Sequence, residues 1–317
     1  MQAVPPMLLR GLHQESRYKR LRLDLASVLM QWGIGILALL WITTRGRLVS
    51  LGYGWLLRSL GAAMLGGAIW ASIATGGSGT ARCVALAASS AAMLCALFAL
   101  ASSILRRAEG VRAARERKIA KTTRVNAMLG EELKIARAGG GESPTATRLV
   151  TAKEFNPSLD LLAPAFGLIA LIAESLTLGG PTIQSAYRLV VGAAFLGALT
   201  DAMLLGHWYL TQPGLPRAPI EELVKISAPI WALEVIGLLW PIGMISVLSG
   251  SIADGYGGIL AWMWALSAAS TGVLIGVTWL ALRERSYSAV MAATGLLYLA
   301  ILTGFGTDVL ARALLGS

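Results

Sequence analysis

The chain has 317 residues, of which 56% are hydrophobic and 14% are charged, and its formal net charge is +10. Average soluble domains carry about 25% charged residues, and the apolar residues here fall in runs of roughly twenty, the length that crosses a ~30 Å hydrocarbon core. The composition excludes an ordinary soluble domain, and the lack of short alternating segments excludes a transmembrane β-barrel.

Eight apolar runs predict an all-α, polytopic bundle of about eight membrane-spanning helices. They lie at about Leu25–Thr44, Gly54–Ala74, Cys83–Leu105, Leu159–Leu178, Tyr187–Leu210, Ile226–Leu248, Ile259–Leu282 and Ser288–Phe305. The expected regions are a basic N-terminal segment (1–24), spans one to three (25–105), a basic polar arm (106–156) and spans four to eight (157–317). Residues 1–24 lack the apolar core of a signal peptide, so the first run is expected to be retained in a bacterial inner membrane.

Basic residues in the connections predict the orientation. The odd-numbered connections hold Lys and Arg, whereas the even-numbered ones read GGSGTA, GGPTIQS and GSIADGYG. Since cytoplasmic loops are enriched in Lys and Arg, the odd connections are expected in the cytoplasm, with both termini outside. The basic N-terminal segment disagrees, which leaves open that one span is misassigned or that the first pair is a re-entrant hairpin. Positive charge placed this way does not predict nucleic-acid binding.

The arm is predicted to be helical over Arg106–Ala138, up to a flexible GGGESPT stretch. One interpretation is a solvated cytoplasmic hairpin. The other is a docking arm for anionic lipid or an acidic partner subunit. Its candidate contact residues are Arg112, Arg115, Arg117, Lys118 and Lys121.

Ionisable residues inside the apolar runs are the main functional lead, because charge in hydrocarbon is costly and usually has a role. They are Glu174, Asp201, His207 and Glu234. Counting from the expected span ends puts Asp201 roughly 13 Å and Glu234 roughly 12 Å inside the same face. Two carboxyl groups close together cannot both stay ionised there. The three acids are therefore proton-relay candidates, and the alternative is that each is a polar group hydrogen-bonded for packing.

Two other polar residues in the apolar runs have simpler predicted roles. His207 lies near the cytoplasmic edge beside Trp208 and Tyr209, where it is either an interfacial anchor or a contact for a quinone or lipid headgroup. Arg58, near the start of the second run, is expected to extend to the interface. Close-spaced Gly, Ala and Ser in spans two, three and seven predict tightly packed helices.

Several chemistries are disfavoured. No metal-binding or phosphate-binding motif is present, a single His in the spans does not suit bis-histidine haem ligation, and no mid-span Lys could hold retinal. Cys83 and Cys95 are twelve residues apart, about 18 Å along one helix, and cannot pair. No covalently bound cofactor and no cofactor held by a recognisable motif is expected. A non-covalently bound quinone is compatible with the sequence.

Three functions remain. Eight helices with membrane carboxylates are similar in outline to the quinone-interacting membrane subunits of respiratory complexes, such as the polysulfide reductase family, and this implies a non-catalytic, redox- or proton-linked subunit of a larger complex with membrane lipids and other subunits as partners. That is the first hypothesis. The alternatives are a proton-coupled secondary transporter of a small solute and a membrane-embedded enzyme acting on lipid.

Overall fold

A computed structural model describes residues 6–112, 115–116, 119, 155–178, 182–212, 215–240, 243–251 and 256–315, with side chains from residue 25 onward. Over these residues the chain forms helices and turns, with no strand. It divides into two units, Met1–Leu100 with Pro157–Ser317 and Ala101–Asn156. Nearly all described helices belong to the first unit.

The helices confirm the predicted class. In chain order they are α1 (Pro6–Arg45), α2 (Leu51–Thr75), α3 (Thr80–Leu105), the short 3-10 helix η1 (Pro157–Leu161), α5 (Leu162–Ser175), α6 (Thr182–Thr211), α7 (Ala218–Leu239), α8 (Met244–Leu248), α9 (Ile259–Arg283) and α10 (Tyr287–Leu315). Seven segments among the described residues are long and apolar enough to cross a membrane: Leu25–Arg45 of α1, α2, α3, η1 with α5, α6, α9 and α10.

The remaining expected span, Ile226–Leu248, is divided between α7 and α8. α7 begins eight residues earlier, at Ala218, and every eighteen-residue stretch of it holds at least three charged residues, so it is not among the seven. It ends at Leu239 because Pro241 follows Trp240, and a residue before proline is driven to extended backbone. Trp240 accordingly has φ −107° and ψ 149°.

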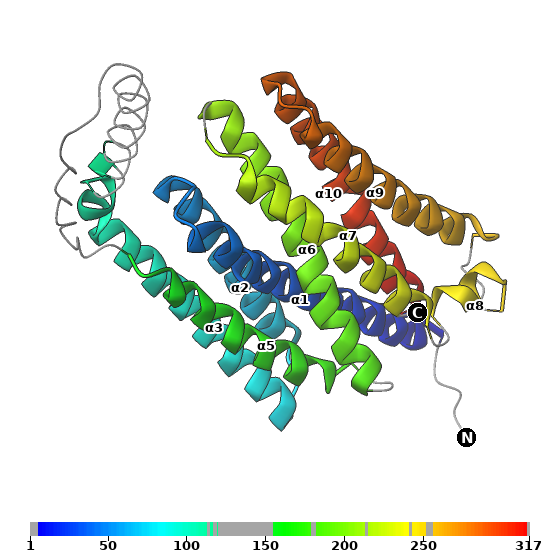
Figure 1. Cartoon of the computed structure of the whole chain (residues 1–317). Helices are drawn as coiled ribbons and strands as arrows, with labels where there is room; N and C mark the ends of the chain where they lie inside the picture. The colour runs from blue at the N-terminus through cyan, green and yellow to red at the C-terminus, as the bar shows by residue number, and fades with distance from the viewer. Residues whose placement is uncertain are drawn as a thin grey trace, which may run out of the picture. The chain divides into compact units, whose positions relative to one another are not determined.

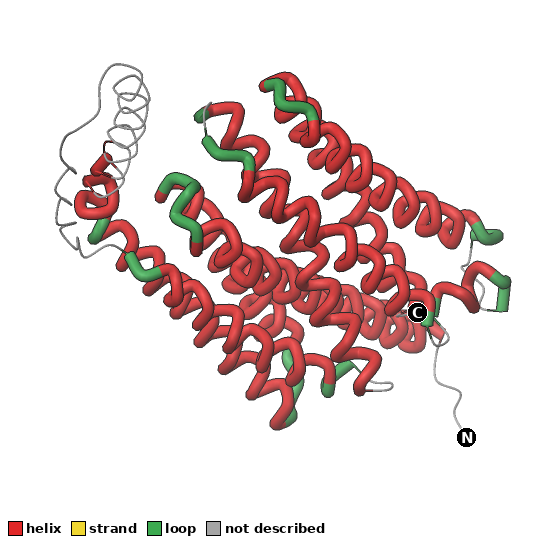
Figure 2. The backbone as a smooth tube through the Cα atoms, viewed as in Figure 1, coloured by secondary structure: helices red, strands yellow, loops and turns green. Residues whose placement is uncertain are grey.

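The connections of the first unit gather at its two ends (Figures 1 and 2). The α1–α2, α6–α7 and α9–α10 connections lie at one end, called here the basic end because it carries Arg45, Arg47, Arg217, Arg283 and Arg285. The α2–α3 and α5–α6 connections and α8 lie at the other, called the opposite end. The three basic connections predicted to share one membrane face thus share one end of this unit.

α6 is the central helix of the first unit. It contacts α1, α5, α7 and α10. In its most apolar eighteen-residue stretch 72% of the residues are buried, compared with 28% in α9. α9 exposes large apolar side chains such as Trp262, Leu266 and Val273, as expected of a helix that faces hydrocarbon.

α1 and α6 meet at a pair of glycines. A Cβ atom added to Gly197 would lie 2.2 Å from the carbonyl carbon of Gly35, and one added to Gly35 would lie 1.8 Å from the carbonyl oxygen of Ala193. Small residues let the two backbones come this close. The sequence predicted such contacts from spans two, three and seven, whereas this one joins spans one and five.

Candidate functional site

Asp201 lies in the middle of α6 with 0% of its surface exposed. Its backbone oxygen accepts a hydrogen bond from Tyr53 Oη at 3.0 Å. The neighbouring Thr200 Oγ1 accepts one from Trp32 Nε1 at 2.7 Å. Neither carboxylate oxygen of Asp201 makes a hydrogen bond to the described residues. The side chain of Asp201 is therefore fully buried, and the two hydrogen bonds connect this part of α6 to α2 and α1.

Glu234 lies at a different level of the bundle, that of Arg188. Two hydrogen bonds between α6 and α7 fix this register. Tyr187 Oη donates to the backbone oxygen of Leu233 at 2.9 Å, and Arg188 Nε donates to that of Gly237 at 3.0 Å. Arg188 is thirteen residues from Asp201 along α6, roughly 20 Å at 1.5 Å per residue.

The predicted placement of Asp201 and Glu234 at one depth is therefore wrong. Its cause is the start of α7, which lies at Ala218 instead of near Ile226, so Glu234 is sixteen residues into the helix and not eight. The structure brings Glu234 together with other charges instead: Asp308, Arg312 and Arg188 act on it electrostatically.

Four helices supply the charged cluster around Glu234. Asp308 Oδ2 accepts a hydrogen bond from Arg312 Nε at 2.8 Å, one turn further along α10. Gln31 of α1 donates through Nε2 to Asp308 Oδ1 at 3.4 Å and accepts a bond from Arg312 Nη2. Arg312 Nη1 also donates to Ser27 Oγ at 3.1 Å. The Asp308–Arg312 pair is thus held by α1 as well as by its own helix.

A cavity of about 720 Å³ adjoins this cluster. Glu234, Arg188, Asp308 and Arg312 line it. Ser78–Arg82, at the end of the α2–α3 connection and the start of α3, and residues 176–178 after α5 also line it, so the cavity lies toward the opposite end of the unit. It will be called the charged cavity.

Two buried atoms around the charged cavity are unsatisfied. Arg188 Nη2, a donor, and Glu234 Oε1, an acceptor, make no hydrogen bond to the described residues. Buried polar groups are nearly always hydrogen-bonded, and charged groups most of all. One donor and one acceptor of opposite charge are therefore available to a molecule in the cavity.

Glu174 is buried at the end of α5, on the same side as the charged cavity. Arg82, which lines the cavity, acts on it electrostatically. Arg82 donates to Thr75 Oγ1 at 2.8 Å and to the backbone oxygen of Ser72. Of the predicted acids, Glu174 and Glu234 are therefore near the same cavity, and Asp201 is apart from it.

His207 lies on the exposed surface of α6, outside the charged cavity. Its Nδ1 lies 3.1 Å from Tyr298 Oη of α10, and the two rings meet edge to face with centroids 6.3 Å apart. This pair presents two hydrogen-bonding groups on the outside of the bundle.

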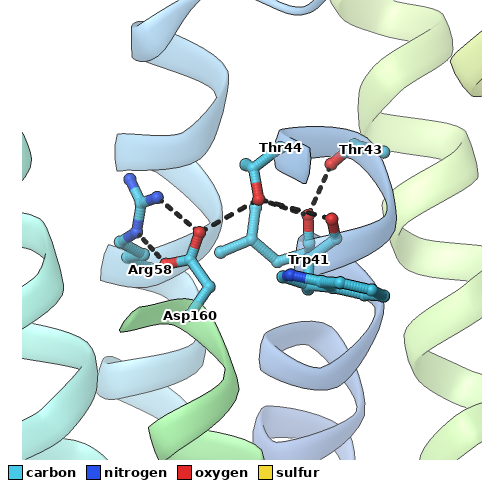
Figure 3. A network of polar contacts seen from close by, with 6 residues as sticks. Trp41, Thr43, Thr44, Arg58 and Asp160 are labelled. Atoms are coloured by element: carbon cyan, nitrogen blue, oxygen red, sulfur yellow. Dashed lines mark hydrogen bonds and ion pairs between the residues drawn. The ribbon is translucent and has the colours of Figure 1, made fainter. Parts of the chain in front are cut away.

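Arg58 does not extend to the interface but is buried with 2% exposure. Its Nε and Nη2 donate to Asp160 Oδ1 and Oδ2 at 2.7 and 2.8 Å (Figure 3). Thr44 Oγ1 donates to Asp160 Oδ2 at 3.0 Å. The expectation for Arg58 was wrong because η1 places a buried carboxylate beside it.

Sequence reasoning missed the partners Asp160, Arg188, Asp308 and Arg312. Ending span eight at Phe305 left Asp308 and Arg312 outside the membrane, although α10 continues to Leu315. Their i, i+4 spacing was a usable signal, because such residues face each other on a helix. No local signal marks Arg58 and Asp160 as a pair.

The predicted arm contacts are only partly within the described residues. Arg112 and Arg115 are exposed, whereas Arg117, Lys118 and Lys121 lie outside the description. Within the described ranges, no group of three or more His, Cys, Asp or Glu residues could hold a metal ion. The predicted quinone contact at His207 remains a prediction.

The fold and the charged cavity define a multi-pass helical membrane protein with ionisable residues between its helices. Comparison with protein-family models, with curated proteins and with solved structures finds no match for the chain.

Proposed function

We propose that the protein is a proton-coupled membrane transporter that binds a small zwitterionic solute in the charged cavity. The observation that carries this proposal is the pair of unsatisfied atoms, Arg188 Nη2 and Glu234 Oε1, at one level of one cavity. A solute with an anionic group and an ammonium group would satisfy both. Burying such groups without a partner costs free energy, which a ligand would recover.

Proton coupling is proposed from the carboxylates that share the site. Glu234 and Asp308 line the cavity in which the solute would bind, and Arg188 and Arg312 lie beside them. A bound ammonium group would favour the ionised form of Glu234, so binding and proton release would be linked.

Binding by the purified protein tests the site. Arg188→Gln and Glu234→Gln are each expected to weaken binding of a zwitterionic amino acid about tenfold or more, because a hydrogen bond to a charged group contributes about 1.5–3 kcal/mol. Asp201→Asn is the matched control, since it removes a buried carboxylate roughly 20 Å away along α6. Isothermal calorimetry across a panel of zwitterionic, anionic and cationic amino acids measures this. Equal weakening by all three variants, or equal binding of the cationic and zwitterionic solutes, would refute the proposal.

The proposed topology has eight crossings, with α7 as the eighth because it runs antiparallel to α6 in contact with it. The basic end faces the cytoplasm of a bacterial cell, by the excess of Lys and Arg there. The charged cavity would then open toward the other side of the inner membrane.

Cysteine labelling tests this orientation. In a Cys83→Ala, Cys95→Ala background, Ser249→Cys is expected to react with a membrane-impermeant thiol reagent on intact cells, and Glu284→Cys only after lysis. Both positions are exposed, so access depends on the side of the membrane. The reverse pattern would invert the topology.

The second candidate function is a membrane subunit of a larger redox- or proton-linked complex. The exposed His207–Tyr298 pair supports it, since a quinone carbonyl could accept a hydrogen bond there. Purification in mild detergent separates the two candidates. Co-purifying subunits with haem or iron–sulfur clusters support the complex, and solute uptake by the protein alone in vesicles supports the transporter. Turnover of added lipid would support the third candidate, a lipid-acting enzyme.

A further inference from the structure

A second cavity, of about 670 Å³, lies at the basic end of the first unit between the start of α7 and the end of α9. Seven residues line it: Arg217, Glu221, Lys225, Trp279, Leu282, Arg283 and Arg285. Four basic residues and one acidic residue give it three net positive charges. It will be called the basic cavity, and the proposed transport site does not use it.

Hydrogen bonds hold its walls together. Arg217, directly before α7, donates from Nη1 to the backbone oxygen of Glu284 at 2.6 Å and from Nη2 to that of Ser286 at 2.5 Å. The guanidinium of Arg283 lies 4.3 Å from the ring centroid of Trp279. The α9–α10 connection is thereby tied to α7.

The other cations of the basic cavity are available. Lys225 and Arg285 are exposed, and neither forms an ion pair within the described part of the chain. Glu221, the acidic residue of the cavity, forms none there either. An anion could therefore approach both cations without displacing a carboxylate.

The cavity extends from the loops to the edge of the apolar zone. Lys225 is seven residues into α7, roughly 10 Å below its start. Trp279 is one turn before Arg283, and tryptophan is enriched at the headgroup level of membranes. Val277 and Val273 of α9, which lie further from the basic end than Trp279, are exposed apolar residues. A headgroup would lie among the cations, and its acyl chains would follow α9.

We propose that the basic cavity binds the phosphate headgroup of an anionic phospholipid in the cytoplasmic leaflet. The diester phosphate would lie between Lys225 and Arg285. Arg283, stacked on Trp279, would supply the third cation. The charge of the cavity excludes cationic ligands, and its position beside an apolar helix face favours a lipid over a soluble anion.

Native mass spectrometry of the full chain tests this, with matched amounts of phosphatidylglycerol and phosphatidylcholine in the detergent. The wild type is expected to retain phosphatidylglycerol preferentially, and Lys225→Gln with Arg285→Gln is expected to lower that retention about tenfold or more. Arg47→Gln with Arg106→Gln removes two exposed charges elsewhere and is expected to leave it unchanged. Equal melting temperatures of the variants would show that folding is unaffected.

Three results would overturn the proposal. The first is equal retention of both lipids by the wild type, and the second is equal loss in the control variant, which would mean that only total charge matters. The third is a Lys225→Gln, Arg285→Gln variant that retains as much phosphatidylglycerol as the wild type but loses a co-purifying acidic protein. If inorganic phosphate at millimolar concentration displaces phosphatidylglycerol, and binding in the basic cavity does not require acyl chains, the site would be reassigned to a soluble anion.

Discussion

Asp160→Ala is expected to lower the free energy of unfolding by about 3–5 kcal/mol, because it leaves a buried cation without its counterion. Arg58 is only 2% exposed, and both of its hydrogen bonds to Asp160 would be lost. Asp160 is likewise only 3% exposed. Thermal and SDS-induced unfolding in detergent measure the loss.

Two further variants test whether the loss of stability comes from leaving the buried Arg58 unpaired or from removing a carboxylate as such. Glu222→Gln removes the exposed pair with Arg45, whose side chains are 39% and 43% exposed, and is expected to cost at most about 1 kcal/mol. Arg58→Met with Asp160→Leu replaces both buried charges and is expected to recover most of the stability. If Asp160→Ala costs no more than Glu222→Gln, the Arg58 site is hydrated and the explanation fails.

Gly197→Ala is expected to destabilise the protein by about 3 kcal/mol or more, at the upper end of overpacking effects. The added methyl would meet backbone atoms of Gly35 at 2.2 and 2.3 Å. Backbone cannot move aside as a side chain can, so α1 and α6 would have to separate. Gly35→Ala should behave alike, since its methyl would lie 1.8 Å from Ala193 O.

Gly276→Ala, on α9, is the matched control. A Cβ atom there would have no neighbour within 4 Å, and alanine is favoured over glycine in a helix by roughly 0.5–1 kcal/mol. Its unfolding free energy should therefore stay equal or rise. A loss at Gly276 as large as at Gly197 would show that helix geometry, not the α1–α6 contact, sets the effect.

The helical membrane class could be predicted because apolar run length reports on hydrocarbon thickness. Helix ends could not, because hydropathy reports on the membrane and not on backbone hydrogen bonds. The first turns of α7 carry Glu221, Glu222 and Lys225 and resemble a loop, yet the helix already begins at Ala218. Because α7 begins at Ala218 and not near Ile226, Glu234 lies eight residues further along the helix than predicted, and its neighbours differ accordingly.

The sequence by itself indicated that ionisable residues lie within the helical bundle, since Asp201, Glu174 and Glu234 fall in apolar segments. In the structure these three residues are at most 4% exposed. Only the tertiary structure decided their partners. Arg58 and Asp160 are 102 residues apart in the chain, and Arg188 meets Glu234 from another helix. Such pairing depends on the rotation and register of packed helices, which contacts such as Gly35–Gly197 set and which no local pattern encodes.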